Sequence, residues 1–322
     1  MNIIVSKDNS GNFSTIQEAI PSIPLNNTTP ITIQIKPGRY QEKLTIDRPY
    51  LTLIGEDPFS TILTFQDHAK MLMPDGSRYG TFRSYTCFLD THDITIQNLT
   101  FENSSGSGRI AGQALALYVD GDRIFFENCR FLGHQDTLFT GPLPPSAIQK
   151  NGFLGPKEHA ERINGRHYYK SCTICGDVDF IFGSATAYFE HCEIYSFIDP
   201  DPSGNNRGYI TAASTPEGQT YGYVFFQCHF TSNCPPHSVY LGRPWRNYAK
   251  TVLLECRLEE HIKEEGWHDW DKAEAHTQTF YAEYHSSGPG AAPEKRVSWS
   301  RQLTEAQAAL YTKEKVLGDW TI

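Results

Sequence analysis

Six segments of the chain align without gaps, and this repeat limits the possible folds more than any other feature of the sequence. In every copy the third, sixth and eighth positions are apolar or aromatic, and five copies have cysteine at the sixth position. Loops of variable length therefore separate a constant unit. The copies are ITIQNLTF (94–101), IFFENCRF (124–131), HYYKSCTI (167–174), AYFEHCEI (187–194), YVFFQCHF (223–230) and TVLLECRL (251–258).

The spacing of the apolar positions requires a bend inside each copy. The third and sixth positions differ in parity, so one straight strand cannot bury both side chains. A corner at the fifth position resolves this, and Asn98 and Asn128 occupy it in the first two copies. Asparagine tolerates the left-handed backbone conformation that a sharp corner needs. Each copy is therefore predicted to form two short strands around a corner, repeated coil after coil.

The fold predicted from this repeat is all-β: a right-handed parallel β-helix that forms a single domain over residues 1–322. An antiparallel β-sandwich is the alternative, but it needs two-residue hairpin signals, for which Asp120-Gly121 is one weak candidate. Capping boxes at residues 14–17 and 304–307 predict short helices at both ends, where a solenoid would otherwise expose apolar surface.

The eight cysteines are predicted to be mostly free thiols. Cys172 and Cys175 form a C-x-x-C pair, but a three-residue offset on a strand points their side chains to opposite faces. We therefore expect a structural role rather than metal or redox chemistry. Five cysteines share the sixth-position column and would stack along the core as small apolar side chains: Cys129, Cys172, Cys192, Cys228 and Cys256.

Charge and composition exclude several classes of protein. A formal net charge of −9, from 28 basic and 37 acidic side chains, argues against a nucleic-acid-binding protein, which needs a basic face. No run of 18 or more apolar residues predicts a transmembrane helix, and no membrane partner is expected. The sequence shows no secretory signal pattern. With free cysteines, this favours a cytoplasmic location; secretion after removal of a signal peptide is the alternative.

Two aspartates occupy equivalent places in consecutive copies. Asp136 follows Cys129 by seven residues, and Asp179 follows Cys172 by seven residues. Since stacked parallel strands lie about 4.8 Å apart, the two carboxylates would lie side by side. Like charges at that distance drive the two pKa values apart, which suits acid–base chemistry. A row of aspartates at solenoid turns is the structural alternative, and the offset alone does not decide between the two.

The residues around the aspartates favour a functional site. Phe180 and Phe182 lie beside Asp179, where they are costly on a surface unless something packs on them, as a sugar ring would. The run LGRPW (241–245) supplies a cation, Arg243, and another aromatic ring, Trp245. These neighbours indicate a carbohydrate-binding groove around a pair of carboxylates.

Five motifs occur in an order that is typical of one enzyme family. They are GRYQE (38–42), QALAL (113–117), GHQDTL (133–138), DFIFG (179–183) and LGRPW (241–245). Residues 5–13 near the N-terminus and the late Gly266, Trp267 and Trp270 also fit. With these motifs the chain resembles the pectin methylesterases of carbohydrate esterase family 8 over nearly its whole length. Ordered motifs are a stronger signal than any one motif alone.

The resemblance implies hydrolysis of the C6 methyl esters of galacturonic-acid chains. It assigns Asp179 as the nucleophile and Asp136 as the general acid that protonates methanol and then acts as the base on water. Gln113, with Gln135, would stabilise the oxyanion, and Arg243 would bond Asp179 and keep it ionised.

The resemblance also implies the binding partners. The sugar groove would be lined by Phe139, Phe182, Trp245 and Trp267. No metal and no organic cofactor is expected. The implied substrate is methyl-esterified pectin or its oligogalacturonides, handled by a monomer.

Three features depart from the family pattern. Many relatives carry tyrosine where this chain has His134 and Phe139. Gln135 adjoins Asp136, so it needs a local bend to serve the same site. The connection 141–164 is roughly twenty residues longer than in known relatives. Because it lies between the coils of the two aspartates, we expect it to wall off one end of the groove and favour short methylated oligomers. A solvated insertion without a role is the alternative.

Two rival functions fit a β-helix that handles pectin. A polygalacturonase would need a third clustered carboxylate, and a pectate lyase would need several carboxylates for Ca²⁺ and a basic residue as proton abstractor. Asp120 and Asp122 could bind an ion but are better explained as part of a turn. A non-catalytic pectin-binding protein would keep the aromatic groove and lose the catalytic groups, and here all the catalytic candidates are present.

Overall fold

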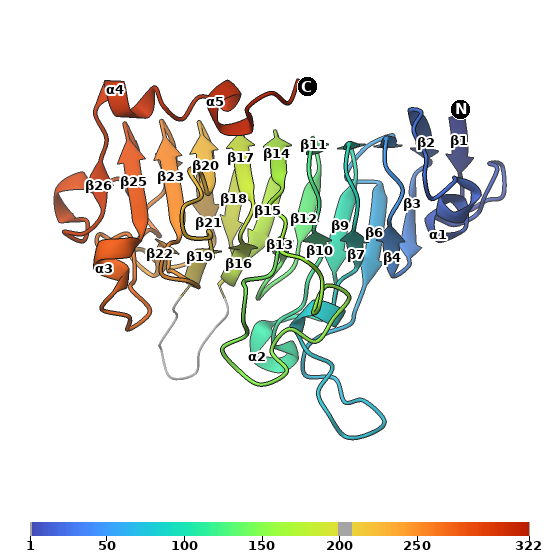
Figure 1. Cartoon of the computed structure of the whole chain (residues 1–322), viewed down its shortest axis with the longest axis horizontal. Coiled ribbons are helices and arrows are strands. Elements are labelled where there is room, and N and C mark those ends of the chain that lie inside the picture. Colours follow the sequence, from blue (N-terminus) through green and yellow to red (C-terminus); the bar gives the residue numbers. More distant parts are fainter. Residues whose placement is uncertain (1, 199–207, 322) are drawn as a thin grey trace.

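The structure, a computed structural model, describes residues 2–198 and 208–321. Its strands form three sheets that run along one solenoid, and every pairing between the named strands is parallel (Figure 1). This confirms the parallel β-helix and excludes the antiparallel sandwich. One coil contributes a strand to each sheet in turn, so that β11, β12 and β13 form one coil and β14, β15 and β16 form the next.

In each sheet, neighbouring strands come from successive coils. Sheet A consists of β1 (Asn2–Val5), β2 (Ile31–Ile35), β5 (Leu51–Gly55), β8 (Ile94–Gln97), β11 (Ile124–Glu127), β14 (Arg166–Lys170), β17 (Thr186–Glu190), β20 (Tyr223–Phe226), β23 (Lys250–Leu254), β25 (Phe280–Tyr284) and β26 (Arg301–Gln302). Sheet B consists of β3 (Gly38–Gln41), β6 (Thr61–Phe65), β9 (Thr100–Asn103), β12 (Arg130–Leu132), β15 (Thr173–Gly176), β18 (Glu193–Ser196), β21 (His229–Ser232) and β24 (Arg257–Leu258). Sheet C consists of β4 (Leu44–Ile46), β7 (Cys87–Leu89), β10 (Leu117–Val119), β13 (Leu138–Thr140), β16 (Val178–Gly183), β19 (Gly208–Ala213) and β22 (Val239–Gly242).

The helices are all short. They are α1 (Ile16–Ala19), α2 (Gly108–Ala111), α3 (Ala275–Gln278), α4 (Glu305–Ala308) and α5 (Lys313–Leu317), with 3-10 turns η1 (Ile20–Ser22), η2 (Thr81–Arg83) and η3 (Pro293–Lys295). Among the described residues, none of these helices has the length and apolar character needed to cross a membrane.

The corner predicted inside each repeat is present in all six copies. The fifth residue has a left-handed backbone each time, with φ between 50° and 56°, although only two of the six are asparagine. The residue that follows is the sixth-position residue of the repeat, which turns into the core. The corner residues are Asn98, Asn128, Ser171, His191, Gln227 and Glu255.

The columns of the repeat fill the interior of the solenoid. The third-position rings stack nearly parallel, Phe126 on Tyr169 at 5.0 Å between centroids, Tyr169 on Phe189 at 4.7 Å and Phe189 on Phe225 at 4.4 Å. The sixth-position thiols approach backbone carbonyls of the preceding coil, as Cys129 does at 3.4 Å from the oxygen of Ile96. All eight cysteines are free, as the sequence predicted.

The two ends of the solenoid are covered differently. Helix α1 begins after Thr15, whose side chain accepts a hydrogen bond from the amide of Glu18, and it buries Ile16 and Ala19 in the N-terminal end of the core. The capping box at Thr304 also forms. The helices that follow, however, lie along the outer face of sheet A rather than across the C-terminal end (Figure 1).

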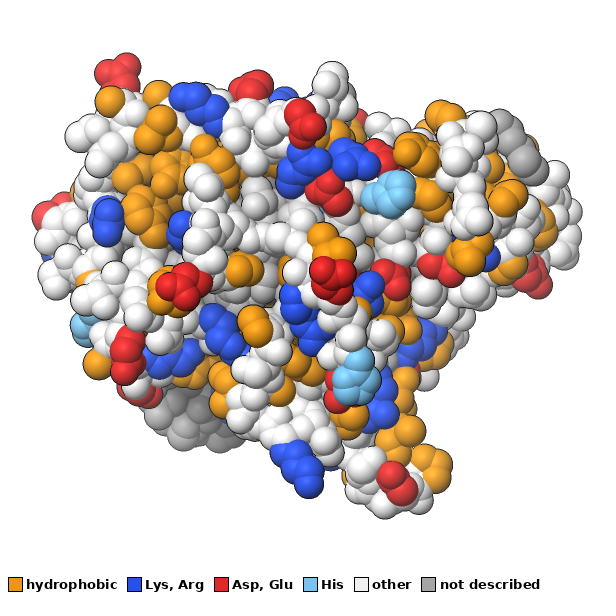
Figure 2. Space-filling model, viewed as in Figure 1, with side chains coloured by type: hydrophobic (Ala, Val, Ile, Leu, Met, Phe, Trp, Pro, Cys, Tyr) orange, Lys and Arg blue, Asp and Glu red, His pale blue; other side chains and the backbone are white. Residues whose placement is uncertain are grey.

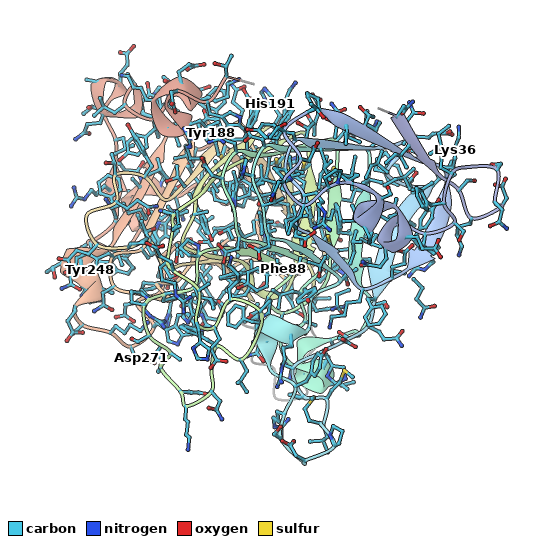
Figure 3. The ribbon with its side chains drawn as sticks, turned by 45° about the vertical axis from the view of Figure 1, so that its right-hand side comes forward. Lys36, Phe88, Tyr188, His191, Tyr248 and Asp271 are labelled. Carbon is cyan, nitrogen blue, oxygen red and sulfur yellow. The ribbon has the colours of Figure 1, made fainter. Side chains whose placement is uncertain are left out.

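An apolar outer face explains the course of the C-terminal helices. Tyr168 and Tyr188 form an outward stripe on sheet A, and Val316 and Leu317 of α5 bury this stripe. Tyr188 is labelled in Figure 3, where Phe88 marks a second outward stripe on sheet C. Hydrophobic side chains also remain visible on the surface beside α4 (Figure 2). Packing on sheet A therefore decided where these helices lie.

Candidate active site

The fold brings Asp136 and Asp179 to the same level of consecutive coils. Leu138 of β13 pairs with Ile181 of β16, and each aspartate lies two residues before its paired residue. The amide of Asp136 donates to the carbonyl of Val178 at 3.0 Å. Both aspartates have left-handed backbones, with φ of 64° and 50°, outside the regular corner column. Such a conformation costs a non-glycine residue roughly 1 kcal/mol or more, and it is typical of functional sites.

Both carboxyl groups are largely removed from water, since Asp136 is 8 % exposed and Asp179 is 6 % exposed. Burial and the neighbouring Asp179 raise the pKa of Asp136 well above its ordinary value. Burial also raises the pKa of Asp179, but the Arg243 guanidinium opposes this rise. The proton of the pair therefore belongs on Asp136, and Asp179 is the carboxylate that ionises first.

Arg243 holds Asp179 with a forked contact. Its Nε donates to Oδ1 at 2.8 Å and its Nη2 donates to Oδ2 at 2.7 Å. The guanidinium lies between two aromatic rings, 3.8 Å from the centroid of Tyr209 and 3.7 Å from that of Trp270. The two rings and the two hydrogen bonds fix the orientation of the planar guanidinium. A lysine ammonium group could not form the forked contact and stack on the rings at the same time.

The two glutamines lie on neighbouring coils at the same edge. The amide of Ala114 donates to the carbonyl of Gln135 at 3.0 Å, which places Gln113 diagonally across from Gln135 on the neighbouring coil. The bend that Gln135 was expected to need follows it directly, because Asp136 has a left-handed backbone. The Gln135 side chain packs against Gly108 of α2 so closely that a Cβ at position 108 would lie 2.7 Å from the Gln135 Cβ.

Three of the four predicted aromatic residues belong to one cluster on the outer face of sheet C, which also includes Phe82. Phe139 and Phe182 are buried in it and do not line an open groove, whereas Trp245, which packs on Phe182, is half-buried. The prediction for Trp267 was wrong. It is 1 % exposed and stacks on Tyr281 inside the solenoid, 4.3 Å between centroids.

The register of the chain explains the error at Trp267. Trp267 forms a parallel bridge with Gly242, so its side chain continues the inward side of the coil. Trp270, three residues later, lies over Arg243 instead. Tyr209 was also missed, although it pairs with Val178, the residue before Asp179. Extending the repeat to the coil after Asp179 would have placed Tyr209 beside the aspartate.

A third carboxylate lies close to the pair. Asp177 is buried, accepts a hydrogen bond from the Val178 amide at 2.7 Å, and lies 3.0 Å from Nδ1 of His134. Its charge raises the pKa of both Asp136 and Asp179. Sequence reasoning found no third carboxylate here. The available signal was the spacing of two residues between Asp177 and Asp179.

A half-buried lysine, Lys272, adds a further positive charge near Asp179. Nζ of Lys272 donates to the carbonyls of Pro244 and Trp245 at 2.6 and 3.2 Å, which ties the Trp270 segment to the segment of Arg243. Burial, together with the nearby Arg246 and Arg243, lowers the pKa of Lys272 to about 8. Its charge lowers the pKa of Asp179.

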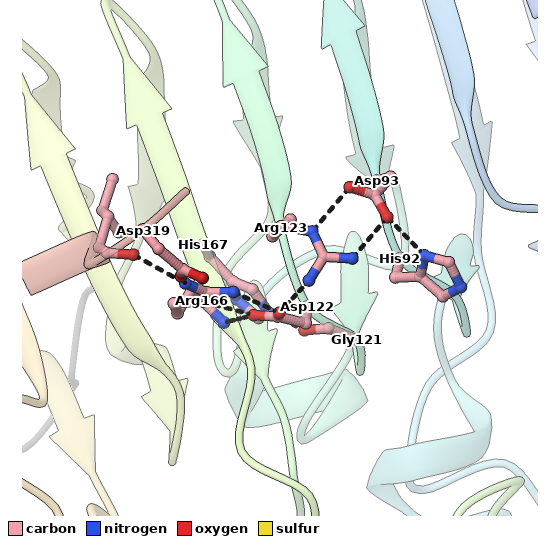
Figure 4. Close-up of polar contacts among 9 residues, drawn as sticks. His92, Asp93, Gly121, Asp122, Arg123, Arg166, His167 and Asp319 are labelled. Atoms are coloured by element: carbon pink, nitrogen blue, oxygen red, sulfur yellow. Dashed lines mark hydrogen bonds and ion pairs between the residues drawn. The ribbon is translucent and has the colours of Figure 1, made fainter. Parts of the chain in front are cut away.

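Of the two acidic residues considered for ion binding, Asp122 is held by arginines. Asp122 accepts hydrogen bonds from Arg123 and from Arg166, and these belong to a row of ion pairs across adjacent coils (Figure 4). Asp120 is buried, and burial raises its pKa to about 6. The structure thus agrees with a turn, in which Asp122 links neighbouring coils.

The fold and the site together define the class of protein. The site consists of two adjacent buried carboxyl groups on a parallel β-helix. One of them holds a proton, and a forked arginine keeps the other ionised. This arrangement is typical of a hydrolase that uses acid–base chemistry. The pectinesterase family model matches residues 2–142 and 153–319. The chain belongs to this family.

Individual relatives agree with the assignment. Pectinesterase 31 of Arabidopsis thaliana is 37 % identical over 311 residues, covering 94 % of this chain and 88 % of that protein. The structure of pectin methylesterase PemA from Erwinia chrysanthemi is similar with a TM-score of 0.80 and 34 % identity, over 99 % of this chain and 97 % of that one. Pectin methylesterase from carrot has a TM-score of 0.81 and 28 % identity, over 98 % and 92 %.

Proposed function

We propose that this chain hydrolyses the methyl esters of pectin, releasing methanol and a free carboxylate, with Asp179 as the nucleophile and Asp136 as the acid and base. The pectinesterase family supports the reaction. The observation that carries the residue assignment is the asymmetry of the carboxyl pair: Arg243 forks onto Asp179 alone, and burial beside that charge keeps the proton on Asp136.

The first half of the reaction forms an acyl-enzyme. A carboxylate oxygen of Asp179 attacks the C6 ester carbonyl, and the carbonyl electron pair moves onto oxygen to give a tetrahedral oxyanion. The side-chain amides of Gln113 and Gln135 donate hydrogen bonds to that oxyanion. Collapse breaks the bond to methoxide, and Asp136 transfers its proton to the departing oxygen, so methanol leaves.

The second half restores both aspartates. Asp136, now a carboxylate, removes a proton from water, and the hydroxide attacks the C6 carbonyl of the anhydride with Asp179. The bond to Asp179 then breaks, which leaves a galacturonate carboxylic acid and an ionised Asp179 paired again with Arg243. All of these groups come from one chain, and we propose that a monomer is active.

Methanol release from methylated polygalacturonate, followed together with the pH of an unbuffered solution, tests the proposal. We expect one methanol and one acid per ester cleaved, with no change in chain length. A fall in viscosity or new unsaturated ends without methanol would instead indicate a depolymerase. Binding to the polymer without methanol or acid would indicate a non-catalytic protein.

The compartment is a further part of the proposal. Eight free cysteines, five of them stacked in the core, suit a reducing environment such as the cytoplasm. An esterase in that compartment would meet imported fragments rather than intact pectin, so short methylated oligogalacturonides are the proposed substrates.

A further inference from the structure

The insertion, residues 141–164 between β13 and β14, includes a stretch that the family model does not match. The family model leaves out residues 143–152, which lie in this connection. In Figure 1 it is the green loop that descends from β13 past α2 before the chain returns to β14. In the sequence it lies between the coil of Asp136 and the coil of Asp179. Its contacts show which parts of the protein it packs against.

Two apolar side chains dock the insertion on sheet C. Leu143 and Phe153 are both buried in the aromatic cluster on the outer face of that sheet. The Phe153 ring meets Phe82 and Trp245 edge to face, with centroids 5.8 and 6.2 Å apart. Phe153 therefore bridges the η2 turn before β7 and the segment that carries Arg243. Such aromatic pairs contribute more than their buried area alone.

Polar contacts hold the insertion at further points. Nζ of Lys157 lies 2.6 Å from Oδ1 of Asp90, just after β7. Arg162 donates to the carbonyl of Pro144 and to three carbonyls between residues 157 and 160, which joins the two arms of the insertion. Nη2 of Arg246 donates to the carbonyl of Ser146 at 2.9 Å. The insertion is thus packed against the body of the protein on several sides.

The docked insertion changes which aromatic surface a sugar can reach. The outward stripe on β7, β10, β13 and β16 is formed by Phe88, Tyr118, Phe139 and Phe182, and all four are buried in the cluster that Phe153 and Leu143 join. No ring of this stripe is left to stack on a sugar. The rings of Trp245 and Trp270, which follow β22, stay partly exposed, although Trp245 also packs on Phe153 and Phe182.

We propose that the insertion ends the sugar-binding groove on the β10 side of the two aspartates, so that the enzyme acts on short methylated oligogalacturonides and chain ends in preference to the interior of a long chain. This inference rests on the proposed function. A long chain bound across the pair would have to pass over β10 and β13, where Leu143 and Phe153 lie. The insertion also reaches Trp245 and Arg246 after β22, so the space on that side suits a short chain rather than a long one.

The test compares two substrates and three variants. Methanol release is measured with long methylated polygalacturonate and with a methylated trimer, and kcat/KM per ester is expressed as a polymer-to-trimer ratio. Phe153→Ser removes the docking ring, and Lys157→Gln removes the ion pair with Asp90 and serves if Phe153→Ser does not fold. Ile148→Ser is the control, because Ile148 belongs to the same insertion but is 71 % exposed.

We expect the unmodified protein to favour the trimer. Phe153→Ser should raise the ratio about tenfold, roughly the effect of one strong aromatic contact, and Lys157→Gln should raise it less. Ile148→Ser should leave it unchanged. Preference of the unmodified protein for polymer, or an unchanged ratio in a folded, active Phe153→Ser variant, would overturn the inference alone. Absence of methanol from both substrates would instead contradict the proposed function.

Discussion

Arg243 and Asp179 form a forked ion pair across 64 residues of sequence, with hydrogen bonds of 2.8 and 2.7 Å that occupy both carboxylate oxygens. Asp136 lies on the adjacent coil, where no described residue makes such a forked contact with it, and burial raises its pKa well above the ordinary value. One arginine thus gives two chemically identical side chains different protonation states. That difference is what an ester-cleaving carboxylate pair requires.

Asp179→Asn should abolish ester hydrolysis while the fold is kept. The amide is nearly the same size as the carboxylate but is a poor nucleophile, so kcat should fall by about 10⁴-fold or more. Methanol release by the purified variant measures the loss, and circular dichroism verifies the fold. A folded variant with near-normal turnover would show that Asp179 is not the nucleophile.

Arg243→Gln should move the acid limb of the pH profile upward. The Arg243 charge lowers the pKa of Asp179, so its removal raises that pKa. Because attack needs ionised Asp179, activity should then be lost at higher pH as the solution is acidified, with a displacement of about 1 pH unit or more. The kcat/KM profile measures the shift. Arg257→Gln, at an exposed arginine, is the control, and an unmoved acid limb would contradict the pairing role.

Gly108→Ala should reduce kcat by displacing Gln135. The new Cβ would lie 2.7 Å from the Gln135 Cβ, which is too close, so the glutamine must shift. We expect a fall in kcat of about tenfold with little change in KM, the pattern for loss of an interaction made in the transition state. Ile110→Ala, at an exposed residue of the same helix, should have no effect.

A double-mutant cycle shows whether Gly108→Ala acts through Gln135. In a Gln135→Ala background, Gly108→Ala should cost almost nothing further, because the displaced side chain is already absent. Full additivity of the two losses would mean that Gly108→Ala acts by another route.

Most of the eight thiols should react in the denatured, unreduced protein. The cysteines are free, and the column of five places sulfur atoms along the core rather than in facing pairs. Titration with a thiol reagent after denaturation measures the number. Fewer than two reactive thiols would overturn this prediction and would favour an oxidising compartment over the cytoplasm.

His167 should make the protein less stable in acid. Burial lowers the pKa of His167 to about 4, whereas the unfolded chain has its ordinary value near 6.5. Below pH 6.5 the unfolded state therefore binds a proton that the folded state does not, and stability falls as pH drops toward 4. From pH 7 to pH 5 this histidine should cost about 2 kcal/mol of unfolding free energy.

Denaturant unfolding of His167→Gln at the two pH values tests that loss. The variant should lose less stability between pH 7 and pH 5 than the unmodified protein does. His159→Gln is the control, because the His159 side chain is 92 % exposed. An unchanged pH dependence in His167→Gln would contradict the assignment.

The repeat in the sequence determined the parallel β-helix and the placement of its two aspartates. Side-chain alternation and the corner at the fifth position fix which residues turn inward, so the stacked Phe126 and Tyr169 could be predicted from their column alone. The same register fixes Asp136 and Asp179, because equal offsets from Cys129 and Cys172 become equal heights on adjacent coils. These relationships are local or periodic, and sequence spacing encodes them.

Tertiary structure alone decided the partners that come from outside the repeat. Arg243 lies between Tyr209 and Trp270, and the Trp267 side chain turns into the core. These residues belong to irregular segments, whose positions depend on packing and not on a repeated spacing in the sequence. The docking of Phe153 on the outer aromatic cluster is of the same kind. An insertion has no counterpart in neighbouring coils, so its position follows only from the surface that it buries.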